Sequence, residues 1–273
     1  MRLAYLGTPQ MAVPPLRALV EHGFDVAAVV TRIDKRRGRG SELAPSPVKA
    51  AAVELGLPVY HRVDDLLGLG IDLGVVVAFG QIIKPHVLAA LPMVNLHFSL
   101  LPRWRGAAPV ERAILAGDDL TGVCVMRVEE GLDTGGVYAV RPVPISDTVT
   151  AEDLRADLVA AGTELLVETL AAPVADWIGN AYPQEGEATY AQKFSAADFE
   201  IDWTVPVVDI HRLIRVGGAW TTFRSKRLKI QAADLVDGRI VPTLVQPEGR
   251  PVMTFDAWRN GARPAPTELF GTK

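Results

Sequence analysis

Cysteine and long apolar runs are nearly absent from this sequence. Cys124 is the single cysteine among 273 residues, which excludes an intrachain disulfide and any zinc site built from cysteine. No apolar run approaches the roughly 20 residues that cross a bilayer. The opening residues 1–7 lack the long apolar core and small-residue cleavage site of a signal peptide, so they predict a first strand. We therefore expect a cytoplasmic protein without membrane contact.

Two nucleotide-binding patterns are also missing. The first predicted turn carries Gly7 alone, with Pro9 two residues later, where a dinucleotide-binding enzyme needs G-x-G-x-x-G. No P-loop G-K-[ST] follows. These absences disfavour a nicotinamide-dependent oxidoreductase and a P-loop enzyme.

Composition indicates a folded chain with one unusual charged segment. Hydrophobic residues make up 49% of the sequence and charged residues 22%, enough for a full core. The net charge of -4 argues against binding nucleic acid with the whole surface. A basic segment at residues 32–40 nevertheless carries five cations and could bind nucleic acid locally. A solvated loop without a binding role is the alternative interpretation. Apart from His97, the histidines are scattered, so we expect no metal site.

The first half alternates β-rich runs with helical stretches, which predicts a doubly wound, mostly parallel, Rossmann-like α/β sheet. The strands that we predict lie at 3–6, 26–30, 73–78, 93–97, 123–128 and 136–143, the last near an edge. The helices that we predict lie at about 11–22, 48–55, 109–116 and 151–170.

Composition changes after the long helix. Residues 179–190 combine glycine, proline and little apolar content, which is typical of a linker. We predict an N-terminal domain over 1–178, a linker over 179–203 and a short C-terminal β domain over 204–273. That last domain is expected to hold a helix at 207–216 and strands at 227–232, 239–245 and 251–255.

Three polar residues are the candidates for chemistry. Asn95 and His97 lie two apart at the end of a predicted strand, so their side chains share a face, and ligands bind at such strand ends. Asp133 lies in a glycine-bounded loop that can approach the same crevice. An amide can donate to an oxyanion, an imidazole can move a proton, and a carboxylate can orient the imidazole. The trio suits acyl transfer to an amine; an ordinary hydrogen-bonded histidine is the alternative.

The wider pattern of residues decides between these interpretations. The run N-x-H-x-S-L-L-P-x-x-R-G-x-x-P over 95–109, followed by GLDTG at 131–135, resembles the 10-formyltetrahydrofolate-dependent formyltransferase family. Other segments resemble its tRNA formyltransferases, in order and at compatible spacing: GTPQMAVPPL (7–16), SPVK (46–49), VVVAFGQIIKP (75–85), YAQKF (190–194), IDW (201–203) and KRLKI (226–230).

The resemblance implies transfer of a formyl group from 10-formyltetrahydrofolate to the amino group of initiator methionyl-tRNA, for translation initiation, by a monomer without a metal. It implies Asn95, His97 and Asp133 as catalytic residues. The implied folate contacts are Phe79, Gly80, Gln81, Ile82, Ile83, Ser99, Leu100, Leu101, Pro102, Val128, Glu129, Glu130 and Gly131. The implied tRNA contacts are Arg36, Arg37, Arg39, Arg103 and Arg105. Core packing is the alternative for Phe79, Ile82 and Ile83, and is favoured for Ile82.

Three features depart from that family, and one is that RVGGAW (215–220) lacks the prolines of the family's Pro-Trp-Pro-Gly turn. Phe98 stands where the family has a small residue, and KRLKI is followed almost directly by what resembles the last strands of a β-barrel. We therefore expect a reduced barrel. An amino-sugar nucleotide or another small amine is the alternative acceptor, and a folate- or RNA-binding paralogue without catalysis is a third possibility.

Overall fold

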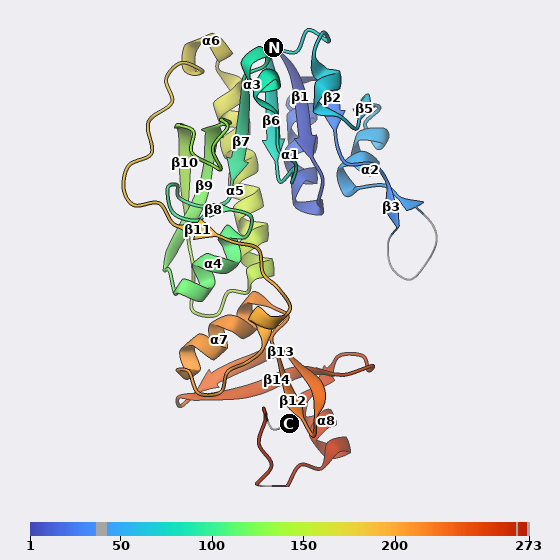
Figure 1. The fold of residues 1–273 in the computed structure, drawn as a ribbon, viewed down its shortest axis with the longest axis vertical. Coiled ribbons are helices and arrows are strands. Elements are labelled where there is room, and N and C mark those ends of the chain that lie inside the picture. Colours follow the sequence, from blue (N-terminus) through green and yellow to red (C-terminus); the bar gives the residue numbers. More distant parts are fainter. Residues whose placement is uncertain (37–42, 266, 272–273) are drawn as a thin grey trace. The chain divides into compact units, whose positions relative to one another are not determined.

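The computed structural model describes residues 1–36, 43–265 and 267–271 (Figure 1). Contacts within the chain define two compact units. Unit 1 comprises Met1–Pro109, Leu120–Pro144 and Arg155–Ala191; unit 2 comprises Val110–Asp119, Ile145–Leu154 and Gln192–Lys273. The division predicted from composition, with a linker over 179–203, stays a prediction.

Unit 1 is built on a seven-stranded sheet in the order β10-β9-β7-β6-β1-β2-β5 (Figure 1). Strands β1, β2, β5, β6 and β7 pair in parallel with one another. Strand β9 pairs antiparallel with both of its neighbours, β7 and β10. The strands of this sheet are β1 (Arg2–Gly7), β2 (Asp25–Val30), β5 (Val59–Tyr60), β6 (Leu73–Val77), β7 (Met93–His97), β9 (Leu120–Arg127) and β10 (Val137–Pro144). The predicted fold class is confirmed.

The central strands of this sheet are apolar because both of their faces are covered. All five residues of β6 are buried, as expected for a parallel strand in the middle of a sheet. One core cluster joins Leu6, Val30 and Val76 to Val87 of helix α3. The helices that lie wholly in unit 1 are α1 (Val13–Glu21), α2 (Pro47–Glu54), α3 (Pro85–Ala90) and α6 (Val174–Trp177). Helices α4 (Pro109–Ala116) and α5 (Ala151–Ala171) each contribute residues to both units.

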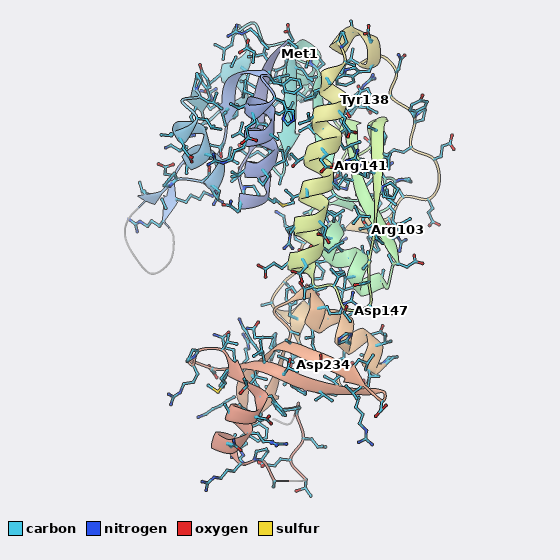
Figure 2. The ribbon with its side chains drawn as sticks, turned by 180° about the vertical axis from the view of Figure 1, so that it is seen from behind. Met1, Arg103, Tyr138, Arg141, Asp147 and Asp234 are labelled. Atoms are coloured by element: carbon cyan, nitrogen blue, oxygen red, sulfur yellow. The ribbon has the colours of Figure 1, made fainter. Side chains whose placement is uncertain are left out.

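Strand β10 forms one edge of the sheet, which confirms the expectation for residues 136–143. Its Arg141 lies against α5 (Figure 2). There the guanidinium contacts two glutamates one helical turn apart. Arg141 lies 2.9 Å from Glu164 and 2.7 Å from Glu168. These ion pairs connect the edge strand to the long helix at the protein surface.

Unit 2 contains a four-stranded antiparallel sheet in the order β12-β13-β14-β15. The strands are Trp220–Phe223, Lys226–Val236, Arg239–Pro247 and Met253–Thr254, and the accompanying helix α7 is Val207–Val216. Ile210 and Ile214 of α7 are buried together with Leu228, Ile230 and Val245 of the sheet. The apolar face of α7 thus covers one side of the hairpin formed by β13 and β14.

The end of unit 2 differs from the prediction. A strand over 251–255 was expected, but β15 spans only Met253–Thr254 and helix α8 follows at Phe255–Ala262. The side chain of Thr254 accepts a hydrogen bond from the backbone N–H of Ala257 and so caps the helix. Trp258 then buries its ring in the core. The cap and this packing outweigh the β-rich composition of the segment.

Candidate active site

Two polar side chains stand near the carboxyl end of β7. Asn95 is half-buried and lies beside Val76 of β6 and Met126 of β9. His97 lies beside Cys124 of β9 and is 5% exposed. Alternation along the strand puts Asn95 and His97 on one face of the sheet. Within the described part of the chain nothing hydrogen bonds to the Asn95 amide, so a ligand can use it.

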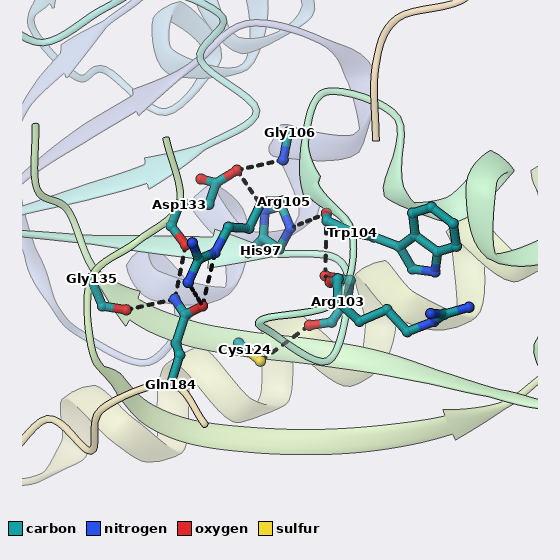
Figure 3. A network of polar contacts seen from close by, with 10 residues as sticks. His97, Arg103, Trp104, Arg105, Gly106, Cys124, Asp133, Gly135 and Gln184 are labelled. Carbon is teal, nitrogen blue, oxygen red and sulfur yellow. Dashed lines mark hydrogen bonds and ion pairs between the residues drawn. The ribbon is translucent and has the colours of Figure 1, made fainter. Parts of the chain in front are cut away.

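The imidazole of His97 is held by two groups (Figure 3). Its Nε2 lies 3.0 Å from the backbone oxygen of Trp104. Because a carbonyl oxygen only accepts, Nε2 carries the hydrogen of this bond. Nδ1 lies 3.7 Å from Oδ2 of Asp133, a contact that becomes an ion pair when the ring is protonated. Nδ1 is therefore the ring nitrogen that can exchange a proton with a ligand.

Asp133 reaches His97 from the loop between β9 and β10. Its backbone φ is 50°, in the left-handed region that residues other than glycine seldom adopt. Besides facing His97, Oδ2 accepts a hydrogen bond of 2.8 Å from the backbone N–H of Gly106. The carboxylate therefore links its own loop to strand β8 (Arg105–Gly106).

The loop after β7 is folded by internal bonds that bring the Trp104 carbonyl to His97. Ser99 is fully buried, and its Oγ donates to the backbone oxygen of Arg103 at 2.6 Å. Cys124 donates its S–H to the backbone oxygen of Ser99 at 3.1 Å. Burial raises the pKa of the Cys124 thiol to about 11, so the sulfur stays protonated. Cys124 is thus a buried structural residue.

A segment read as linker from its composition contacts both loops of the site. We call residues 182–191 the strap. Gln184 accepts hydrogen bonds from Arg105 and donates to the backbone oxygens of Asp133 and Gly135 (Figure 3). Thr189 Oγ1 accepts from the backbone N–H of Trp104 at 2.9 Å. Sequence reasoning missed Gln184 and Thr189 because no motif marks a side chain whose partners are backbone atoms of distant loops.

The residues predicted to bind folate fall into groups by exposure. Phe79, Ile83 and Ser99 are buried, and the first two belong to the core cluster of unit 1. Core packing therefore describes those two side chains. The half-buried members are Leu100, Leu101, Pro102 and Val128. The exposed members are Gly80, Gln81, Ile82, Glu129, Glu130 and Gly131.

Ile82 corrects one interpretation of the sequence. Core packing was favoured for this residue, but its side chain is 93% exposed. The chain turns after β6: Ala78 and Gly80 both have positive φ, and Ile82 follows in the loop ahead of α3. An exposed isoleucine beside a strand end is available to an apolar ligand. Phe98, by contrast, is 5% exposed, so its ring is part of the interior.

The residues predicted to contact tRNA lie in two places. Arg36 is exposed on β3 (Lys35–Arg36), which pairs with β4 (Leu43–Ala44), whereas Arg37 and Arg39 lie outside the described residues. Arg103 is exposed with its guanidinium 4.6 Å from the centre of the Trp104 ring, and Arg105 is half-buried against Gln184.

The base of the basic segment is fixed by side chains on both flanks. Lys49 Nζ lies 2.8 Å from each carboxylate oxygen of Asp34. The hydroxyls of Thr31 and Ser46 are 2.7 Å apart, and Ser46 also caps helix α2 by accepting from the Lys49 N–H. The S-P-V-K motif thus has a structural use: it ties the start of helix α2 to Thr31 and Asp34, at the start of the basic segment.

Comparison with known proteins identifies close relatives. The Formyl transferase family model matches residues 1–170, and the model for the formyl transferase C-terminal domain matches residues 193–239. A methionyl-tRNA formyltransferase of Symbiobacterium thermophilum is 40% identical, over 96% of this chain and 92% of its own length. One from Frankia casuarinae is 44% identical, over 100% of this chain and 86% of its own length.

Solved structures show the same fold at lower identity. Methionyl-tRNA formyltransferase from Clostridium thermocellum has a TM-score of 0.63 at 16% identity, covering 90% of this chain and 98% of its own. The N-formyltransferase from Helicobacter canadensis, solved with folinic acid and dTDP-3-aminofucose, has a TM-score of 0.69 at 18% identity, covering 92% and 98%.

Proposed function

The chain belongs to the formyl transferase family, and we propose that it formylates the amino group of initiator methionyl-tRNA with 10-formyltetrahydrofolate as the donor. The observation that carries the choice of acceptor is the 40% and 44% identity, over nearly the whole chain, to relatives named methionyl-tRNA formyltransferase. In this proposal the protein acts as a monomer and without a metal ion.

The chemistry needs one new carbon–nitrogen bond and one proton transfer. The lone pair of the neutral methionyl amine attacks the formyl carbon, and the carbonyl oxygen becomes an oxyanion. The bond from that carbon to N10 of the folate then breaks. The amine loses a proton and N10 gains one, so the products are the formylated amine and tetrahydrofolate.

Three side chains serve these steps in the proposal. The amide of Asn95 donates to the oxyanion, where a fixed donor stabilises developing charge. Nδ1 of His97 takes the proton from the attacking amine and returns it to N10. Asp133, 3.7 Å from Nδ1, stabilises the charged ring between these transfers. Trp104 fixes the ring orientation by accepting from Nε2.

The donor is proposed to bind across the strand ends beside this trio. Exposed Ile82 and half-buried Leu100 and Val128 supply apolar surface for a pteridine, and the neighbouring loops supply backbone hydrogen-bonding groups. Buried Phe79, Ile83 and Ser99 act by shaping these loops. Their side chains are not proposed to touch the donor directly.

The acceptor is proposed to bind through arginines. Arg36, Arg37 and Arg39 of the basic segment, with Arg103 and Arg105 at the site, would contact phosphates of the acceptor stem. Contacts of this kind displace counterions, so the affinity falls as salt concentration rises.

The test is formyl transfer from 10-formyltetrahydrofolate to charged initiator tRNA, compared with a panel of amino-sugar nucleotides. The proposal expects efficient formylation of the tRNA, with a KM that rises steeply with salt. Arg36→Gln should flatten that salt dependence, and Arg239→Gln, in the hairpin of unit 2, serves as the charge-matched control. Transfer to a sugar amine with the tRNA untouched would overturn the acceptor assignment. Absence of transfer to any amine would overturn the enzymatic proposal itself.

A further inference from the structure

We propose that Gln184 is a positioning residue for the proposed formyl transfer: its single amide sets the Asp133 loop and the Arg105 guanidinium at the same time. The inference rests on the function proposed above and adds a residue to its machinery. Figure 3 shows Gln184 between the two loops of the site, with bonds to both.

The nitrogen end of the amide holds the Asp133 loop. Nε2 of Gln184 lies 2.8 Å from the backbone oxygen of Asp133 and 2.8 Å from that of Gly135. An amide nitrogen has two hydrogens, and both are used here. Asp133 has a φ of 50°, a conformation that persists only where surrounding contacts enforce it. Gly135 is also confined by Arg127, because a Cβ on Gly135 would overlap the backbone oxygen of Arg127.

The oxygen end of the amide holds Arg105. Oε1 of Gln184 lies 3.1 Å from Nε and 2.7 Å from Nη2 of the guanidinium. Arginine is donor-only and the carbonyls of Asp133 and Gly135 are acceptor-only, so just one orientation of the amide satisfies all four bonds. A carboxylate could serve Arg105 but not the carbonyls. An apolar side chain of the same size could serve neither.

The backbone on either side of Gln184 is anchored, so its side chain has a fixed origin. Before it, Tyr182 exchanges two backbone hydrogen bonds with Val137, at 2.8 and 2.9 Å. After it, β11 (Tyr190–Ala191) pairs in parallel with β8. The strap is therefore attached to β10 at one end and to β8 at the other.

Because its backbone is anchored, Gln184 can fix the position of the Asp133 loop relative to His97. Asp133 contacts His97 at 3.7 Å and Gly106 at 2.8 Å, and both contacts depend on where its loop lies. A misplacement of about 1 Å at a catalytic group can cost on the order of a hundredfold in rate. Releasing the two carbonyls should therefore slow the chemical step without removing any group that touches substrate.

Two variants distinguish the role of the amide oxygen of Gln184 from the role of its amide nitrogen. Gln184→Glu keeps oxygen acceptors for Arg105 but sets a carboxylate oxygen against the carbonyls of Asp133 and Gly135. We expect kcat to fall on the order of tenfold or more, with KM for tRNA unchanged. Gln184→Leu removes both ends, so kcat should fall similarly and KM for tRNA should also rise. Glu185→Ala, at the exposed neighbour, is the matched control and should change neither.

A second measurement does not need enzymatic activity. In protein labelled with 15N-histidine, the His97 ring nitrogens, assigned by comparison with His97→Gln, report which nitrogen carries the proton and what it faces. We expect the Nδ1 signal to move in Gln184→Glu and Gln184→Leu, and to stay in place in Glu185→Ala. If wild type transfers no formyl group but this signal moves, the proposed function fails and the positioning role stands.

The inference is overturned by wild-type kcat in Gln184→Glu, or by an unmoved Nδ1 signal in both variants. It is also overturned if both variants merely unfold at lower temperature while kcat and KM of the folded fraction match wild type. A merely structural glutamine would give that last result.

Discussion

Nε2 of His97 donates to the backbone oxygen of Trp104 across 3.0 Å, which leaves Nδ1 directed at Asp133. The bond selects the working nitrogen of the ring before any substrate arrives. It also makes the course of the loop from Ser99 to Trp104 part of the site, because a backbone atom of that loop determines the tautomer of the imidazole.

The first prediction concerns the two polar residues of β7. Asn95→Ala and His97→Ala should each reduce the single-turnover rate of tRNA formylation on the order of a hundredfold or more, since an oxyanion donor and a general base are lost. Rapid-quench measurement with saturating folate checks this. His22→Ala, at an exposed histidine, is the control and should behave as wild type. Near-normal rates in both variants would contradict the proposed mechanism.

The variant Asp133→Asn tests whether the negative charge of Asp133 is needed for catalysis, because it changes the charge of the side chain but hardly its shape. The replacement keeps an oxygen that can accept from the Gly106 N–H, but it removes the carboxylate that faces His97. We expect kcat to fall on the order of tenfold or more with little change in thermal midpoint, because only the stabilisation of the charged ring is lost. Steady-state kinetics and a thermal melt check this. An unchanged kcat would show that Asp133 has no part in the proton transfer.

Cys124 should resist thiol reagents in the folded protein. Its sulfur is buried and the thiol pKa is raised to about 11, so very little thiolate forms at mildly alkaline pH. Mass spectrometry after iodoacetamide treatment should find no adduct on the native chain and one adduct in guanidinium chloride. Rapid modification of the native protein would mean that the loop over residues 99–104 opens.

A pH-dependent contribution to stability is expected at Glu268. Hydrogen bonds from Arg224 and from the backbone N–H of Ala265 lower its pKa from 4.5 to about 2. Because the folded pKa is depressed, the contribution is fully present above the unfolded value of 4.5 and is lost as pH falls through about 2.

The variant Glu268→Gln should therefore have a lower thermal midpoint than wild type at neutral pH. The difference should shrink as pH falls from 4.5 toward 2. Calorimetry across this range provides the measurement, and Asp256→Asn, in a longer surface ion pair of 3.4 Å, is the control. A difference in thermal midpoint that stays constant at every pH would show that the charge of Glu268 is not the source of the stabilisation.

The ion pair between Asp34 and Lys49 should affect the binding of tRNA more than the rate of formyl transfer. Lys49→Met removes the ion pair that fixes the base of the basic segment, so part of the ordering cost moves to the binding step. We expect KM for tRNA to rise about three- to tenfold and kcat to stay near wild type. Initial-rate kinetics over tRNA concentration checks this, with Lys84→Met, a lysine in a long 3.9 Å ion pair, as the control. A fall in kcat with constant KM would place the effect at the site instead.

Sequence patterns predicted those parts of the fold that depend on local periodicity. The buried run of β6 and the alternation that pairs Asn95 with His97 on one face are visible as patterns, and the helices at 109–116 and 207–216 have the predicted bounds. Helix α8 was missed because its start depends on the Thr254 cap and its stability on the burial of Trp258. Burial of this kind is a property of the folded chain.

The residues of the candidate site also fall into some that the sequence could predict and some that it could not. Side chains with a chemical signature could be named from the sequence, whereas Gln184 and Thr189 could not, because their partners are backbone atoms brought close only by folding. Ile82 was misjudged for a related reason: an apolar run does not reveal that the chain turns outward after Ala78 and Gly80.

The attachment of the strap at both ends limits how this sequence can change in length. The stretch between Tyr182 and Tyr190 must span from β10 to β8 and place the Gln184 amide on the way. An inserted or deleted residue there would shift Gln184 away from its three partners, Arg105, Asp133 and Gly135, even though the stretch is polar and lacks a helix or strand of its own. Tolerance to insertions, normally high in such surface connections, should therefore be low here.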